Sequence, residues 1–207
     1  MNALRPGRDC AQRGFTLIEV LITVFVAGVG LLAVAGLQAM SKKFNYDAIQ
    51  RTAAGTLAQA MVERMRGNPG ELEAYLTLDA AASTAGTSCT GADAACTPPQ
   101  LAAHDLYTWG RLLAGDEVQV DGQSVGGLVE PTGCISADTT PGLYVVAIAW
   151  RGLTGIEAPD GDDLTDPALH PCGLGSGRYD DPKQNGDDDR MRRVLLLHAF
   201  VADPNAP

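Results

Sequence analysis

The chain divides into an almost wholly apolar N-terminal run and a long remainder in which apolar and polar residues alternate at short intervals. The run extends from Phe15 to Met40 and holds one charged residue, Glu19. As a helix, Leu17 to Ala39 would measure about 35 Å, which is enough to cross a hydrocarbon core of about 30 Å. We therefore expect residues 15–40 to be a transmembrane helix.

Helical periodicity continues beyond Met40. Apolar residues recur at four- or five-residue steps and form a stripe, while polar residues occupy the other faces. The stripe consists of Phe44, Ile49, Ala53, Leu57, Met61 and Met65, and the polar faces hold Gln50, Arg51, Gln59, Glu63 and Arg66. The run Gly67-Asn68-Pro69-Gly70 predicts the end of the helix. Residues 41–68 are thus expected to be an amphipathic continuation that packs its stripe on the chain's own domain.

Residues 69–207 are expected to form that domain. Pro98–Ala114 has the pattern of a second helix, and Gly115 is a suitable stop. Four later segments have the composition of strands: 117–120, 124–130, 143–150 and 193–201. Strands that follow a long helix without regular β-α-β alternation indicate an α+β fold, with an antiparallel sheet packed on the long helix.

The N-terminus has two ordinary interpretations. A secretory signal peptide would be cleaved after Ala33-Val34-Ala35, before Gly36, but the apolar run is too long for one. A signal anchor would be held with its N-terminus in the cytoplasm by three leader arginines, Arg5, Arg8 and Arg13. Neither explains Glu19, because a carboxylate in the apolar region costs up to about 3 kcal/mol.

A third interpretation explains the glutamate. The segment Gly14-Phe15-Thr16-Leu17-Ile18-Glu19-Val20 resembles the prepilin signature of type IV pilins and pseudopilins. The resemblance implies that residues 1–14 are a leader, that prepilin peptidase cleaves between Gly14 and Phe15, and that the new N-terminal Phe15 is methylated. It also implies that Glu19 meets the N-terminal amine of a neighbouring subunit and sets the axial register of a filament.

Three later segments, 57–69, 146–152 and 192–194, are similar to those of PilV-type minor pilins. This resemblance implies a minor pilin that takes part in pilus assembly or priming. The subunit would cross the inner membrane once, with its N-terminus cytoplasmic and its domain periplasmic, before entering the extracellular pilus. Its expected partners are prepilin peptidase, other minor and major pilins, and the pilus assembly platform.

Three other functions stay open at this point. The chain could be a minor pseudopilin of a type II secretion system, or a pilin whose domain binds a ligand such as DNA or a host surface. It could also be a secreted hydrolase that begins at Gly36. The formal charge is −10 and the first fourteen residues carry +2, which leaves −12 on the rest. Nucleic-acid binding is therefore not expected unless Arg190, Arg192 and Arg193 gather with other basic residues on one face.

Four cysteines follow the apolar run: Cys89, Cys96, Cys134 and Cys172. An even number of thiols beyond a membrane span predicts two disulfides in an oxidising compartment. We favour Cys89 with Cys96, which closes a short loop, and Cys134 with Cys172, which brackets the strand at 143–150. The crossed pairings are not excluded by the sequence.

No pattern predicts catalysis or a tightly bound cofactor. The acidic segment 157–189 contains two runs with oxygen ligands and glycine turns, 160–163 and 185–189, but neither has the spacing of an EF-hand, and a solvated loop is the preferred interpretation. His170-Pro171-Cys172 has no second pair of ligands to form a zinc site. The glycines of 173–177 lack the context of a phosphate loop, and no nucleophile elbow is present. We expect no metal, with calcium the one candidate, and no enzymatic activity.

Overall fold

The computed structural model describes residues 14–91, 95–116, 119–124, 126–156, 167–183, 189–202 and 204. It consists of two compact units, Met1–Phe44 and Asn45–Pro207. Helix α1 (Leu17–Gly67) contributes its first part to one unit and its second part to the other. The predicted long N-terminal helix is confirmed, with its start at Leu17 rather than Phe15.

The first unit contains the apolar part of α1. Every described residue from Gly14 to Phe44 is exposed, including large apolar side chains such as Phe25 and Leu32. By length and composition, α1 is able to cross a membrane. So much continuous apolar surface is not stable against water and needs lipid or other helices around it.

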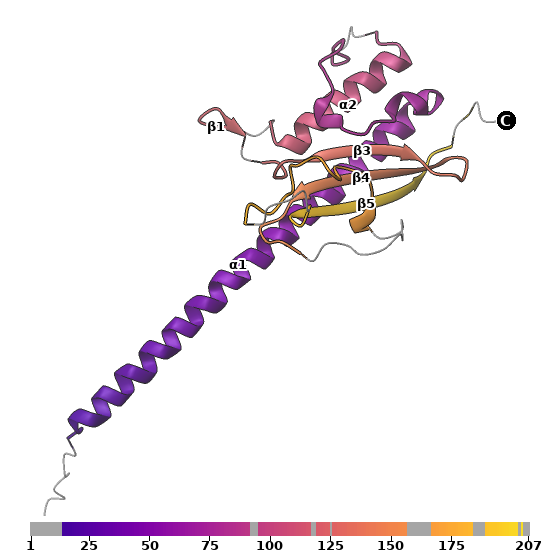
Figure 1. The fold of residues 1–207 in the computed structure, drawn as a ribbon. Coiled ribbons are helices and arrows are strands. Elements are labelled where there is room, and N and C mark those ends of the chain that lie inside the picture. Colours follow the sequence, from indigo (N-terminus) through magenta and orange to yellow (C-terminus); the bar gives the residue numbers. More distant parts are fainter. Residues whose placement is uncertain are drawn as a thin grey trace, which may run out of the picture. The chain divides into compact units, whose positions relative to one another are not determined.

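The second unit has the predicted α+β architecture. Three antiparallel strands lie in the order β3 (Thr132–Ala137), β4 (Leu143–Arg151) and β5 (Arg192–Phe200), as Figure 1 shows. The remaining elements are helix α2 (Pro98–Ala114), a small hairpin of β1 (Gln119–Val120) and β2 (Gln123–Ser124), and three 3₁₀ helices, Pro69–Tyr75, Ala80–Ala82 and Pro167–Leu169. Gly115 ends α2 in the left-handed conformation, with φ 78°, as predicted.

One face of the sheet forms the main core with both helices. Strand residues Ile135, Val146 and Ile148 are at most 2% exposed, and they lie in one cluster with Met61 of α1 and Trp109 of α2. Successive residues on a strand point to opposite faces, so this alternation selects the side of the sheet that the helices cover. The domain therefore has the helix-on-sheet layering that the pilin fold requires.

The predicted apolar stripe on α1 is partly wrong. Met61 and Met65 are buried as expected, whereas Ile49 is 56% exposed and Gln50, which was assigned to a polar face, is buried. The buried face consists of Gln50, Ala54, Ala58, Met61, Val62 and Met65. The buried face thus includes two small alanines, Ala54 and Ala58, while the pattern had weighted the larger side chains.

Strand β3 has no counterpart among the predicted strands, and Gly133 explains why. A Cβ built on Gly133 would lie 2.6 Å from Leu113 Cδ1 and 2.7 Å from Trp109 Cζ3. The strand therefore needs a glycine, a residue that weakens strand propensity, so that the indole ring of α2 can pack on its backbone. The indole N–H of Trp109 then donates a 3.0 Å hydrogen bond to the Leu57 carbonyl of α1.

Two of the weaker strand predictions have different outcomes. The segment 124–130 is wrong as a strand, because only Ser124 lies in β2 and residues 126–130 form bends and coil. A positive φ of 47° at Glu130 turns the chain immediately before β3. Of the segment 117–120, Gln119 and Val120 are in β1, and residues 117 and 118 lie outside the described part.

A buried polar network joins the end of α1 to α2. Asp105, 8% exposed, accepts a 2.8 Å hydrogen bond from the Tyr75 hydroxyl and one of 3.1 Å from Arg64. The Asn68 amide donates to the Pro98 carbonyl at 2.8 Å. Burial, together with the neighbouring carboxylate of Asp105, raises the pKa of Tyr75, so its hydroxyl is a donor at any physiological pH.

We expect Asp105→Ala to lower the free energy of unfolding by about 3 kcal/mol, because it leaves a buried hydroxyl and a guanidinium without their acceptor. The measurement is urea unfolding of the full chain in detergent micelles, followed by fluorescence of the buried Trp109 and Trp150. Glu63→Ala is the control, since its pair with Arg66 is exposed and contributes about 1 kcal/mol or less. Equal losses in the two variants would contradict the importance of the network.

Candidate functional site

The segment from Gly14 to Glu19 is exposed and changes conformation at Thr16. Gly14, Phe15 and Thr16 have no regular secondary structure, and α1 begins at the next residue. The backbone N–H of Glu19 lies 3.1 Å from the Thr16 carbonyl oxygen and 3.4 Å from Thr16 Oγ1. Thr16 is therefore the N-cap of the helix, and the Gly14–Phe15 peptide bond lies before the first turn, in an exposed segment.

Gly14 is not required by the chain's own packing. A Cβ on Gly14 would meet no atom within 4 Å, and its φ does not lie in the left-handed region. A glycine there serves something other than the folding of this subunit. It is suited to close approach by an enzyme, and it also disfavours extension of the helix towards the leader, because glycine is about 1 kcal/mol less favourable than alanine in a helix.

Glu19 is the acidic residue of the first turn of α1. A carboxylate is favoured at this end of a helix by the unpaired backbone N–H groups. If the chain is cut before Phe15, an ammonium forms four residues from this carboxylate. The segment then presents opposite charges at the start of an apolar helix. The leader residues 1–13, with Arg5, Arg8 and Arg13, lie outside the described part of the chain.

The second face of the sheet carries the inner disulfide. Cys134 of β3 is bonded to Cys172, and both residues are at most 3% exposed. Cys172 belongs to the segment 167–183, here called the strap. The strap covers this face and includes Tyr179, which is fully buried. The Tyr179 hydroxyl contacts Thr132 Oγ1 at 2.7 Å and donates to the Glu130 carbonyl at 2.9 Å. The strap is thus attached to the sheet by a covalent bond and by a buried tyrosine.

The outer disulfide joins Cys89 to Cys96 and closes a loop immediately before α2. Thr97 caps that helix in a capping box with Gln100, whose side chain accepts from the Thr97 N–H at 2.9 Å. Both bonds are those that the spacing of the cysteines favoured. The crossed pairings are absent from this structure.

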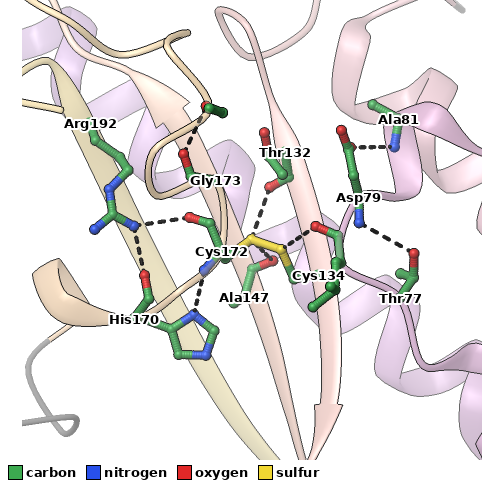
Figure 2. The surroundings of a disulfide bond; sticks show 12 residues. Thr77, Asp79, Ala81, Thr132, Cys134, Ala147, His170, Cys172, Gly173 and Arg192 are labelled. Carbon is green, nitrogen blue, oxygen red and sulfur yellow. Dashed lines mark hydrogen bonds between the residues drawn. A yellow bond between two sulfur atoms is a disulfide. The ribbon is translucent and has the colours of Figure 1, made fainter. Parts of the chain in front are cut away.

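Arg192 is one of the three arginines whose clustering on one face would have been needed for nucleic-acid binding. It is 4% exposed and faces the strap. Its guanidinium donates to the carbonyls of His170 at 2.8 Å and Cys172 at 2.9 Å, and also to that of Ala168 (Figure 2). Burial lowers its pKa, while the carboxylate of Asp189 opposes the shift. Arg192 consequently holds the strap and is not part of a nucleic-acid surface.

His170 is fixed in its neutral form by the same arrangement. Its Nδ1 accepts a 3.2 Å hydrogen bond from the Cys172 N–H, which only an unprotonated nitrogen can do. Partial burial, and then the charges of Arg192 and His198, lower its pKa. A zinc site with Cys172 is ruled out because that sulfur is bonded to Cys134.

Among the residues that the structure describes, no group of three or more potential ligand side chains could hold a metal ion. The acidic run 160–163 lies outside those residues, as does most of 185–189. Asp189 is described, and its Oδ2 accepts from the Gly175 N–H at 2.7 Å. The prediction of a possible calcium loop therefore stays untested.

The structure combines a long apolar N-terminal helix with an antiparallel sheet, an arrangement consistent with the pilin fold. Residues 36–107 match a family model described as Tt1218-like, type IV pilin Tt1218, and residues 10–35 match that of the prokaryotic N-terminal methylation motif. No curated protein and no solved structure matches the chain. Over these residues the chain is similar to a type IV pilin and to the prepilin methylation motif.

The strap should make the stability of the domain dependent on pH through His170. The pKa of this residue is about 6.5 in the unfolded chain and lower in the folded one. Between the two values the unfolded chain binds more protons, so the stabilisation is present above about pH 6.5 and is lost as the pH falls to the folded pKa.

We expect the Tm of the wild type to fall more between pH 7.5 and pH 5 than the Tm of His170→Asn, which keeps an acceptor but does not titrate. Thermal unfolding of both proteins across this range measures the difference between their Tm profiles. All other titrating groups are the same in the two proteins, so their contributions cancel in that difference. Parallel Tm profiles would contradict the role of His170.

Proposed function

We propose that this protein is a minor pilin of a type IV pilus, similar to the PilV type, and that it acts in pilus assembly or priming. Prepilin peptidase removes residues 1–14 by cutting between Gly14 and Phe15, and the new amine of Phe15 is methylated. The match of residues 10–35 to the methylation motif supports this processing. The Gly14–Phe15 bond is exposed and lies before the helix, which supports its accessibility to a peptidase.

The single observation that carries the proposal is the position of Glu19 in the first turn of an exposed apolar helix. Inserting an unpaired carboxylate into an apolar region costs about 3 kcal/mol. Attraction to an ammonium 4 Å away contributes about 4 kcal/mol at an effective dielectric constant of 20. The two terms are nearly equal, so the contact adds little net affinity. The contact does, however, strongly destabilise any axial register of neighbouring subunits in which either charge is left unpaired.

The membrane location follows from the same helix. Residues 15–40 cross the inner membrane, with the arginine-bearing leader in the cytoplasm and the domain in the periplasm. Two disulfides in the domain are in keeping with that oxidising compartment. On assembly the apolar part of α1 exchanges lipid for the helices of other minor and major pilins at the assembly platform.

The subunit has a structural role in this proposal and no reaction of its own. A minor pseudopilin of a type II secretion system would share the processing site and the helix, and would differ in its partners. Co-purification with pilus subunits or with secretion subunits separates these two functions.

Replacement of Glu19 by Ala is expected to leave cleavage and membrane insertion intact and to reduce incorporation into pili at least tenfold. The reason is that the amine of the neighbouring subunit is left unpaired among apolar helices. Quantitative immunoblotting of sheared pili against the membrane fraction measures incorporation.

Thr23→Ala is the matched control, because Thr23 lies one turn further along the same exposed apolar run and its hydroxyl bonds only to the Val20 carbonyl, at 2.8 Å. It should enter pili at the wild-type level. Wild-type incorporation of the Glu19→Ala variant would remove the register role from the proposal.

A further inference from the structure

Two arginines on neighbouring strands lie side by side on the face of the sheet that the strap covers. Arg151 of β4 and Arg192 of β5 are paired in the antiparallel register, so their side chains lie on the same face. Like charges directly opposite each other on neighbouring strands destabilise a sheet. Such a pair therefore needs hydrogen-bond acceptors that offset the repulsion between the two guanidinium groups.

The strap supplies these acceptors from its main chain. Arg192 donates to the carbonyls of residues 168 and 170, which precede the disulfide in the sequence, and to that of Cys172, which forms it. Arg151 donates to the carbonyls of residues 178 and 180, beyond it, and also approaches Glu130 at 3.4 Å. The two guanidinium groups thus hold both halves of the strap, with Cys172 between them. Figure 2 shows the contacts of Arg192 with His170 and Cys172.

The surface below the strap is shaped to receive it. Between the arginines and Cys134 the sheet presents two alanines, Ala147 and Ala149, which leave room for backbone to approach. Gly173 has a φ of 72°, and a Cβ there would lie 2.7 Å from the Tyr179 ring and 3.3 Å from the Ala149 Cβ. These contacts are made by atoms other than the two sulfur atoms.

Chain length cannot explain the choice of the inner disulfide partner. Cys134 and Cys172 are 38 residues apart in the sequence, and Cys96 lies equally far before Cys134. Loop-closure entropy depends on that separation, so it does not distinguish Cys172 from Cys96 as the partner of Cys134. While Cys96 is still a free thiol, contacts that place Cys172 beside Cys134 can decide between the two partners.

We propose that Arg192, assisted by Arg151, is a positioning residue for the oxidation of Cys134 and Cys172: it docks the strap while both residues are thiols and so selects this pairing. One thiolate attacks a disulfide oxidant and releases a thiol, and the other thiolate then displaces the second oxidant sulfur. The protein loses two electrons and two protons, and the oxidant is reduced to thiols. The bond locks a strap that is already in place.

The test is oxidative refolding of the full chain. Reduced chain is diluted from guanidinium chloride into detergent micelles with oxidised and reduced glutathione, quenched by alkylation at intervals, and mapped by mass spectrometry. Wild type and the control Arg66→Gln, an exposed arginine bound only to Glu63, should form the Cys134–Cys172 bond at the same rate. In Arg192→Gln we expect closure about tenfold slower, because the strap carbonyls have lost the guanidinium that donates to them, with Cys96–Cys134 bonds appearing. Native bonds at the wild-type rate would overturn the proposal.

A second measurement decides the matter if Arg192→Gln does not fold. In a Cys134→Ser, Cys172→Ser chain, trypsin should cut after the exposed Lys183 in the strap at a rate close to that in the oxidised wild type. Cleavage at the rate of unfolded chain, with the fluorescence of Trp109 unchanged, would show that the bond itself holds the strap and would refute docking before oxidation.

Discussion

The apolar surface of α1 from Leu17 to Phe44 must be surrounded by something other than water, and this constraint governs the rest of the account. In the proposed function, lipid satisfies it before assembly, and the apolar helices of other subunits satisfy it afterwards. Because both environments are equally apolar, the exchange gains little from the hydrophobic effect, and specific contacts decide the geometry. A single charge in the first turn is well placed to provide such a contact.

The second part of the same helix belongs to the core of the domain. Its buried face holds two alanines and two methionines, and the Leu57 carbonyl and Arg64 are bound by α2. A pull on the apolar part of α1 is therefore resisted by the domain core through one continuous helix. The strap and its disulfide complete the other side of the sheet, where the helices give no cover.

Hydrophobic periodicity predicted those helices and strands whose own sequence carries a clear apolar pattern. Helices α1 and α2 and strands β4 and β5 were found within one or two residues of their bounds, because each has a long apolar repeat. Strand β3 was missed since Gly133 makes room for Trp109, and the contact joins residues that are distant in sequence. The stripe on α1 was placed wrongly because residue size is a poor guide where helix and sheet approach closely.

The residues of the candidate site likewise divide into those with a local sequence signal and those without one. Gly14, Phe15 and Glu19 could be named from a local motif. The Cys89–Cys96 pair was favoured by its short loop, and Cys134–Cys172 because it brackets a predicted strand. Thr16 as the helix cap had a local signal, since a threonine three residues before a glutamate is typical of a capping box. Arg192 and Asp105 had none, because a charged side chain in a sequence gives no sign of the carbonyls or hydroxyl that bury it.

Mass spectrometry of the N-terminus of the protein isolated from membranes tests the central claim most directly. The account predicts a chain that begins at Phe15 with one added methyl group on its amine and that keeps the whole apolar run. A chain that begins at Gly36, or one that still starts at Met1 where the peptidase is active, would contradict it.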